Sequence, residues 1–213
     1  MPKDTFFNLP EEKRNRIIEV AIEEFKEYSY DASSINRIVE SSGISKGSFY
    51  QYFGDKKDLY KYIIDIIVEK KLEYISPVMA NPFEHDIFTL LRETFKSGLS
   101  FAFENPDYLE IGNKLYADPS HPIYKELLQE NKYKSNDFFL LLLKNAKKRG
   151  EIREDLDLEM VAFILTNVYL SFADYYAKVA GKKEFSEEML AEAEKFTNFI
   201  KFGISKKGGI LDD

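Results

Sequence analysis

The side chains between residues 41 and 54 form the segment best suited to specific chemistry in this 213-residue chain. The chain has a formal net charge of −7, yet Lys46 is the only charged residue in the segment. Glutamine and serine side chains such as Gln51 and Ser48 can hydrogen-bond to base edges, lysine and tyrosine can bind phosphates, and Gly47 allows a close backbone approach. An acid-free polar surface on an acidic chain indicates a local binding site for nucleic acid.

Two short helices separated by a glycine turn are expected to present this segment. Either Ser33 or Ser34 can cap the first helix, and Gly43 can end it because glycine adopts the left-handed backbone at little cost. Ser45 can cap the second helix, in which Phe49 and Phe53 lie four residues apart and can face a small core. A turn of about four residues between two such helices is typical of a helix-turn-helix, whose second helix enters the major groove of DNA.

A longer pattern extends on both sides of this turn, between residues 14 and 59. Its members are Ile18, Ala21, Phe25, Tyr30, Ser34, Ile38, the run from Gly43 to Phe53, Lys56, Asp58 and Leu59. This pattern resembles the DNA-binding domain of the TetR family of regulators. The resemblance implies contacts to the DNA backbone from Ser34, Ser45, Tyr50, Tyr52 and Lys56. It also implies contacts to bases or to the groove from Asn36, Lys46, Gly47, Ser48 and Gln51, with Arg37 as a further candidate.

Several of these side chains also have a purely structural alternative. Tyr50 and Tyr52 could pack in the core of a three-helix unit, and Ser34 and Ser45 could act only as helix caps. Lys56 could be a solvated surface charge. The segment could also be a DNA-binding-like head on a helical small-molecule carrier or enzyme, which salt-dependent binding of duplex DNA would distinguish from a regulator.

The elements around the segment are expected to be helical throughout. Apolar residues recur with helical spacing, and no sustained alternation indicates a sheet. We predict an all-α protein with a helix-turn-helix domain over residues 1–54 and a larger helical effector-binding and dimerisation domain over residues 55–213. The expected helices span roughly residues 10–28, 35–42, 45–53, 55–75, 87–103 and 106–116, a segment ending at Gly150, 155–180 and 186–206.

The larger domain carries apolar residues on more than one face of its penultimate helix, which therefore needs a partner. The family resemblance implies that the last two long helices pair with their copies in a second subunit as a four-helix bundle. The expected interface residues are Val161, Leu165, Val168, Phe172, Tyr176, Met189, Phe196 and Ile200.

Dense aromatic residues in the same domain predict a cavity for a small, largely apolar molecule. The alternative is that these aromatics simply form the core, as most aromatics at helical spacing do. The candidate lining residues are Phe88, Phe95, Phe103, Tyr108, Tyr116, Phe138, Phe163 and Asn167.

Other classes of protein find little support in the sequence. Cysteine is absent and only two histidines occur, so neither thiolate chemistry nor a metal site is expected. Phosphate-binding glycine loops and nucleophile motifs are missing, so we expect no enzymatic activity and no cofactor. Polar residues such as Asp174 interrupt the apolar stretch 160–180, which is not expected to span a membrane. The lack of cysteine and of a signal peptide favours the cytoplasm.

We therefore expect a homodimeric transcription regulator that binds double-stranded operator DNA and senses a small molecule. By resemblance, repression with release by the ligand is the expected mode of action. A constitutive DNA-binding dimer without an effector is the remaining alternative.

Overall fold

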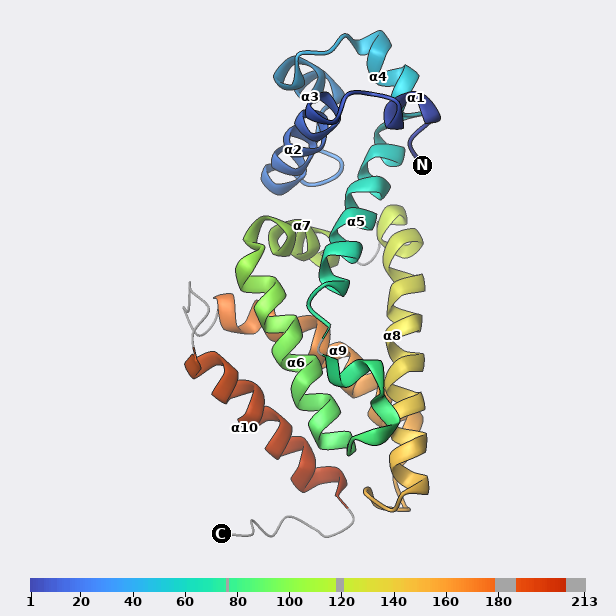
Figure 1. The fold of residues 1–213 in the computed structure, drawn as a ribbon, viewed down its shortest axis with the longest axis vertical. Helices are drawn as coiled ribbons and strands as arrows, with labels where there is room; N and C mark the ends of the chain where they lie inside the picture. The colour runs from blue at the N-terminus through green and yellow to red at the C-terminus, as the bar shows by residue number, and fades with distance from the viewer. Residues whose placement is uncertain (76, 118–120, 179–186, 206–213) are drawn as a thin grey trace. The chain divides into compact units, whose positions relative to one another are not determined.

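The computed structural model describes residues 1–75, 77–117, 121–178 and 187–205. As predicted, the described chain is all-α, and its only β-type pairing is an isolated bridge between Ile152 and Ser205. None of the described helices combines the length and the apolar character needed to cross a membrane. The α-helices (Figure 1) are α1 (Asp4–Phe7), α2 (Glu11–Glu27), α3 (Ile35–Ser42), α4 (Lys46–Tyr52), α5 (Lys56–Leu72), α6 (Ile87–Glu104), α7 (Pro106–Ala117), α8 (Pro122–Lys148), α9 (Leu158–Lys178) and α10 (Glu187–Ile204). Two short 3-10 helices, η1 (Pro77–Ala80) and η2 (Pro82–Glu84), precede α6.

The chain divides into two compact units, each made of two separate stretches of sequence. The first unit comprises residues 1–73 and 105–127, and therefore holds α1 to α5, α7 and the first residues of α8. The second unit comprises residues 74–104 and 128–213, with α6, most of α8, α9 and α10. The domain boundary expected after residue 54 stays a prediction.

Aromatic and branched side chains of α2, α4 and α5 form the core of the first unit. Phe25, Phe49 and Phe53 are buried, which confirms the expected inward direction of the two phenylalanines beside the turn. The ring of Tyr60 meets the ring of Phe25 edge-on, with centroids 4.7 Å apart. Burial raises the pKa of the Tyr60 hydroxyl far above its usual value, so this residue serves as a neutral core aromatic.

Helix α7 and the first residues of α8 pack against other helices of the first unit. The Lys114 ammonium donates a hydrogen bond to the main-chain carbonyl of Lys26, near the C-terminal end of α2. Glu126, near the start of α8, forms ion pairs with both Lys57 and Lys61 of α5. Hydrogen bonds from these two lysines lower the pKa of the Glu126 carboxyl. This stretch is therefore attached to the unit through α2 and α5.

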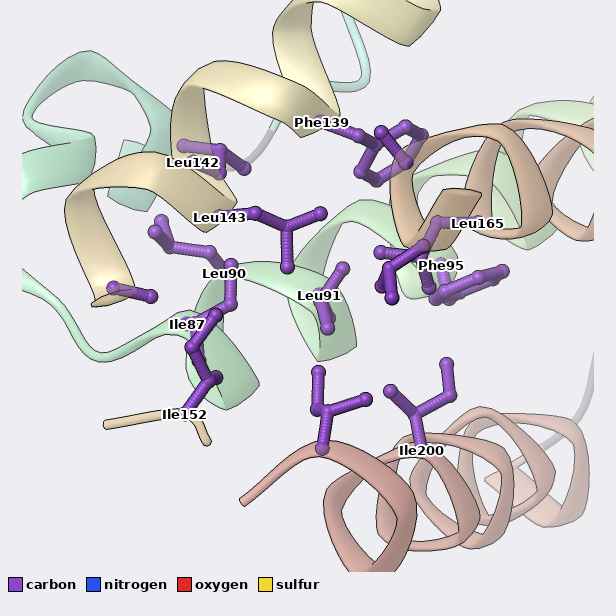
Figure 2. Packing of buried hydrophobic residues seen from close by; sticks show 14 of the residues in the cluster. Ile87, Leu90, Leu91, Phe95, Phe139, Leu142, Leu143, Ile152, Leu165 and Ile200 are labelled. Carbon is purple, nitrogen blue, oxygen red and sulfur yellow. The ribbon is translucent and has the colours of Figure 1, made fainter. Parts of the chain in front are cut away.

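The core of the second unit is assembled around α6, which packs against both α9 and α10. Figure 2 shows this cluster of buried apolar side chains. Its labelled members are Ile87, Leu90, Leu91, Phe95, Phe139, Leu142, Leu143, Ile152, Leu165 and Ile200. Gly98 of α6 lies close to the Tyr169 ring of α9, since an added Cβ would lie 3.1 Å from Cε2 of Tyr169, which is closer than an ordinary contact.

Candidate nucleic-acid interface

The turn between α3 and α4 has the geometry of a helix-turn-helix. Gly43 adopts φ 69° and ψ 29°, the left-handed conformation that ends α3, and its N–H is bonded to the Glu40 carbonyl at 3.2 Å. Two residues later, the Ser45 hydroxyl accepts a hydrogen bond of 3.0 Å from the Ser48 N–H and caps α4. The sequence-based prediction of both signals is confirmed, so α4 occupies the place of the recognition helix.

Among the exposed polar side chains at the starts of α3 and α4 and along α4, three have no hydrogen-bond or ion-pair partner in the described part of the chain. They are Asn36 at the start of α3, and Lys46 and Gln51 on α4. Within the described part of the chain, no hydrogen bond or ion pair engages these three side chains. Tyr50 lies beside them with 43% of its surface exposed. We call Asn36, Lys46, Gly47, Tyr50 and Gln51 the recognition face.

An open hollow of about 280 Å³ lies where α3, α4 and α5 begin. Its lining residues are Ser33, Ser34, Ile35, Asn36, Lys46, Tyr50 and Lys56. The Ser34 hydroxyl makes no capping hydrogen bond to α3. Uncapped N–H groups of a helix start carry partial positive charge, and here they share the hollow with the ammonium group of Lys46. Such a surface suits a phosphate of a nucleic-acid backbone.

Gly47 is not required by the fold of the subunit itself. A Cβ built at this position would lie 3.7 Å from the Ser45 hydroxyl, which is an ordinary van der Waals distance. The missing side chain instead leaves the exposed surface of α4 flat at this point. Ser48, by contrast, is half-buried, and its hydroxyl is bonded to that of Ser45 at 2.9 Å.

A buried carboxylate joins α2 to the start of α3. Glu24 is only 7% exposed, and its Oε1 accepts a 2.7 Å hydrogen bond from the Ser34 N–H. The Arg37 guanidinium donates to both oxygens of Glu24 and to the Ala32 carbonyl, and it stacks 4.0 Å from the centre of the Tyr28 ring. The bonds to Glu24 raise the pKa of Arg37. The charge of Arg37 is therefore engaged in contacts within the subunit.

Lys56 is likewise occupied by main-chain groups. Its ammonium donates hydrogen bonds to the carbonyl oxygens of Tyr30 at 2.5 Å and of Ser33 at 2.9 Å, and it lies 4.5 Å from the centre of the Tyr30 ring. Partial burial lowers the pKa of Lys56. Lys56 thus fixes the turn between α2 and α3. We call Glu24, Ser34, Arg37 and Lys56 the polar seam.

Tyr52 differs from its neighbour Tyr50 in being only 7% exposed. Its ring lies 6.2 Å from the ring of Phe6, a residue of the N-terminal helix α1. This burial favours the core-packing alternative for Tyr52. Sequence reasoning missed α1 and the role of Glu24. The signals that could have found them are the adjacent Phe6 and Phe7, and a carboxylate on the inward side of α2 next to Phe25.

The expected interface residues divide between the core of the second unit and its edge. Val161, Leu165 and Ile200 are buried within a single chain, so these side chains are not available to a partner. Val168 and Phe196 are half-buried against the same core, while the side chains of Phe172, Tyr176 and Met189 lie outside the described residues. Other apolar side chains of these two helices are exposed instead, namely Met160, Phe163, Ile164, Tyr175, Phe199 and Phe202.

The expected pocket residues are brought together only in part. Phe95 is buried in the second unit, and Phe88, Phe103 and Phe138 pack half-buried against the same core. Phe163 is exposed, and Asn167 donates a 2.6 Å hydrogen bond to its carbonyl. Tyr108 is half-buried in the first unit, and the side chain of Tyr116 lies outside the described residues. No group of three or more potential metal ligands occurs among the described residues.

Two family models match the chain. Residues 17–63 match a model described as bacterial regulatory proteins of the tetR family. Residues 85–203 match a model described as the tetracyclin repressor-like C-terminal domain, and this match spans more than half of the chain.

Individual relatives support the same assignment. The uncharacterized HTH-type transcriptional regulator YezE of Bacillus subtilis is 26% identical over 168 residues, which are 76% of this chain and 84% of the relative. The repressor AcnR of Corynebacterium glutamicum is 22% identical over 84% of this chain and 89% of its own length. A crystal structure of a TetR family regulator from Chloroflexus aurantiacus is 35% identical, with a TM-score of 0.77 over 96% of this chain and 99% of that chain. This chain therefore belongs to the TetR family, whose members are ligand-responsive, DNA-binding transcription regulators that dimerise.

Proposed function

We propose that the chain is a repressor that binds a near-palindromic operator as a homodimer and is released by a small molecule. The recognition face supports this proposal most directly. It presents polar side chains without intramolecular partners in the described chain, mainly on the second helix of a helix-turn-helix, and it contains no acidic group. Two copies of α4 would enter successive major grooves, with centres about 34 to 36 Å apart. The repressor acts in the cytoplasm, where chromosomal DNA is accessible.

The recognition face and the hollow beside it divide the contacts to DNA. Lys46, Tyr50 and Ser34, together with the first turn of α3, hold a phosphate, because they line one open hollow. Gln51 and Asn36 hydrogen-bond to base edges, and Gly47 lets the backbone of α4 approach the groove floor. Ser45 and Ser48 remain secondary candidates, because their hydroxyls are already bonded to each other.

The dimer interface consists of the exposed apolar side chains of α9 and α10. On α9, Met160, Ile164 and Tyr175 recur with the spacing of one helical face, and Phe163 adjoins them. On α10, Phe199 is 74% exposed and Phe202 follows one turn later. Exposed apolar residues of this size mark a surface for protein contact. The substitution Phe199→Glu is expected to convert dimers to monomers in sedimentation equilibrium, while Lys13→Glu on the exposed surface of α2 leaves the dimer intact.

The effector is a small, largely apolar molecule that binds among the half-buried aromatics Phe88, Phe103 and Phe138. Apolar walls with few polar groups suit such a ligand. A ligand that binds more tightly to the form of the dimer that cannot bind DNA lowers the affinity for the operator. The operator lowers the affinity for the ligand by the same factor, because coupling between sites is reciprocal.

Selection of bound duplexes from a random pool tests the proposed function. The full-length protein is expected to enrich one near-palindromic sequence, and its affinity should fall steeply as the salt concentration rises. Enrichment of no sequence, or binding that ignores salt, would contradict the proposal and favour a small-molecule carrier.

A further inference from the structure

We propose that Lys3, Thr5 and Phe6 are positioning residues for DNA reading, because they form the C-terminal cap of the recognition helix. This inference rests on the proposed function. These residues precede the stretch 17–63 that matches the family model. We call residues 3–9, which include α1, the arm.

The arm satisfies the carbonyl groups at the end of α4. The last carbonyls of a helix have no partner within the helix. Here the Lys3 N–H donates to the Tyr52 carbonyl at 2.8 Å, and the Lys3 ammonium donates to the Tyr50 carbonyl at 2.8 Å. The Thr5 hydroxyl donates to the carbonyl of Gln51, which lies between them. Three consecutive carbonyls are therefore bonded to two residues of the arm.

The charge of Lys3 adds to this arrangement. An ammonium group at the C-terminal end of a helix interacts favourably with the negative end of the helix dipole. The last turn of α4 contains no basic residue of its own. Lys3 supplies from the arm the cation that the sequence of α4 lacks.

Phe6 anchors the arm in the core of the first unit. Its side chain is fully buried, and its ring centre lies 4.8 Å from that of Phe53 and 5.5 Å from that of Tyr62. The arm also forms its own turn, in which the Phe6 N–H donates to the Lys3 carbonyl at 2.8 Å. The arm is therefore held between the end of α4 and α5.

The position of this cap connects it to the recognition face. Two of the three bonded carbonyls belong to Tyr50 and Gln51, whose side chains lie on that face. Because α4 is only seven residues long, its last turn depends on these contacts for a fixed backbone. Loss of the cap would leave Gln51 attached to a frayed turn and would weaken base reading more than phosphate binding.

The variants Lys3→Met and Thr5→Val, combined in one protein, test this role. They remove the ammonium and the hydroxyl while keeping similar side-chain volume. Lys13→Met is the matched control, because Lys13 is exposed on α2 and makes no polar contact in the described part of the chain. Affinity is measured at several salt concentrations for the selected operator and for an operator altered at one base pair.

The double variant is expected to bind the selected operator about tenfold more weakly and to discriminate less against the altered one. The slope of affinity against salt should equal that of the wild type. The conservative single variant Lys3→Arg, which keeps the cation, should discriminate between the two operators as well as the wild type does. In the free protein, the amide of Phe53 at the end of α4 should exchange faster, whereas amides of α3 should not.

Two results would overturn the positioning role. A salt slope reduced by about one would mean that Lys3 binds a phosphate directly. A lower melting temperature with unchanged discrimination would mean that the arm only stabilises the unit. Both differ from failure of the proposed function, in which the wild-type protein itself would select no duplex.

Discussion

The recognition face and the polar seam lie in the same unit and contain similar residue types, but their polar groups are used in opposite ways. On the recognition face, Lys46 and Gln51 have no partner among the described residues of the chain. In the seam, Glu24, Arg37 and Lys56 are bonded to one another or to main-chain groups. The family pattern contains both lysines, so it does not reveal whether a charge is available to DNA. The hydrogen-bond partners of each lysine in the structure indicate whether its charge is available.

This comparison separates two classes of variant. Changes in the seam should reduce the stability of the first unit, because they leave partly buried polar groups without partners. Changes in the recognition face should reduce DNA binding and leave stability nearly unchanged, because exposed side chains without contacts contribute little to folding.

Glu24→Ala is expected to have the largest effect. It removes the acceptor of the Ser34 N–H and of the Arg37 guanidinium, and should lower the free energy of unfolding by about 2 to 3 kcal/mol. Urea unfolding of the purified protein measures this value. Glu23→Ala is the control, because Glu23 is exposed and its surface ion pair with Lys26 contributes little to stability. Equal losses for both variants would remove the distinction between seam and surface.

The pair Lys56→Met and Lys46→Met tests the comparison most directly. Lys56→Met should lower the free energy of unfolding by about 1 to 2 kcal/mol and leave the salt slope of operator binding unchanged. Lys46→Met should alter stability by less than about 0.5 kcal/mol and reduce the salt slope by about one. A reduced slope for Lys56→Met would show instead that this lysine contacts the DNA backbone, as the family resemblance implies.

Gln51→Ala should sharpen the assignment of base reading. Loss of a bidentate contact to a base is expected to reduce discrimination at one operator position about tenfold, within the range of about 1 to 3 kcal/mol for such contacts. Binding to unrelated duplexes should not change. Asn15→Ala, which removes an exposed amide from α2, should preserve the wild-type sequence preference in the same selection experiment.

Gly47→Ala is expected to change the free energy of unfolding modestly, and in the opposite direction to the seam variants. Replacing glycine within a helix should raise the free energy of unfolding by about 0.5 to 1 kcal/mol, because the new methyl group meets only an ordinary contact. Operator affinity should fall, because the methyl group keeps the backbone from the groove. Gly112→Ala on α7 should give a similar gain in stability without loss of affinity, since a Cβ added there would meet no atom within 4 Å.

The sequence predicted those parts of the site that depend on neighbouring residues. The left-handed Gly43, the Ser45 cap and the inward Phe49 all follow from interactions within one or two turns of helix. The partners of Lys56 did not follow, because the carbonyls of Tyr30 and Ser33 converge on it only in the folded chain. Helix α1 was missed for the same reason, since the burial of Phe6 depends on residues more than forty positions away.

Helical periodicity could not predict which face of α9 is buried. This helix carries apolar residues on several sides, so its sequence does not reveal which side meets its own core. The structure buries Val161 and Leu165, and it leaves the adjacent Met160 and Ile164 exposed. An amphipathic helix such as α2 has one apolar stripe, and Ile17, Ala21 and Phe25 on that stripe are buried.

The contacts of α7 and of residues 121–127 within the first unit limit how the DNA-binding part of one regulator could be transplanted onto another. Besides the bonds from Lys114 and Glu126, the ring nitrogen of His121 lies 3.1 Å from the carboxylate of Asp31, in the loop before α3. A chimera that contained only residues 1–54 of this chain would lack these contacts. It would also lack Lys56, which donates hydrogen bonds to the α2–α3 loop. Exchange of specificity is better attempted by grafting the outward residues of α4 onto an intact host.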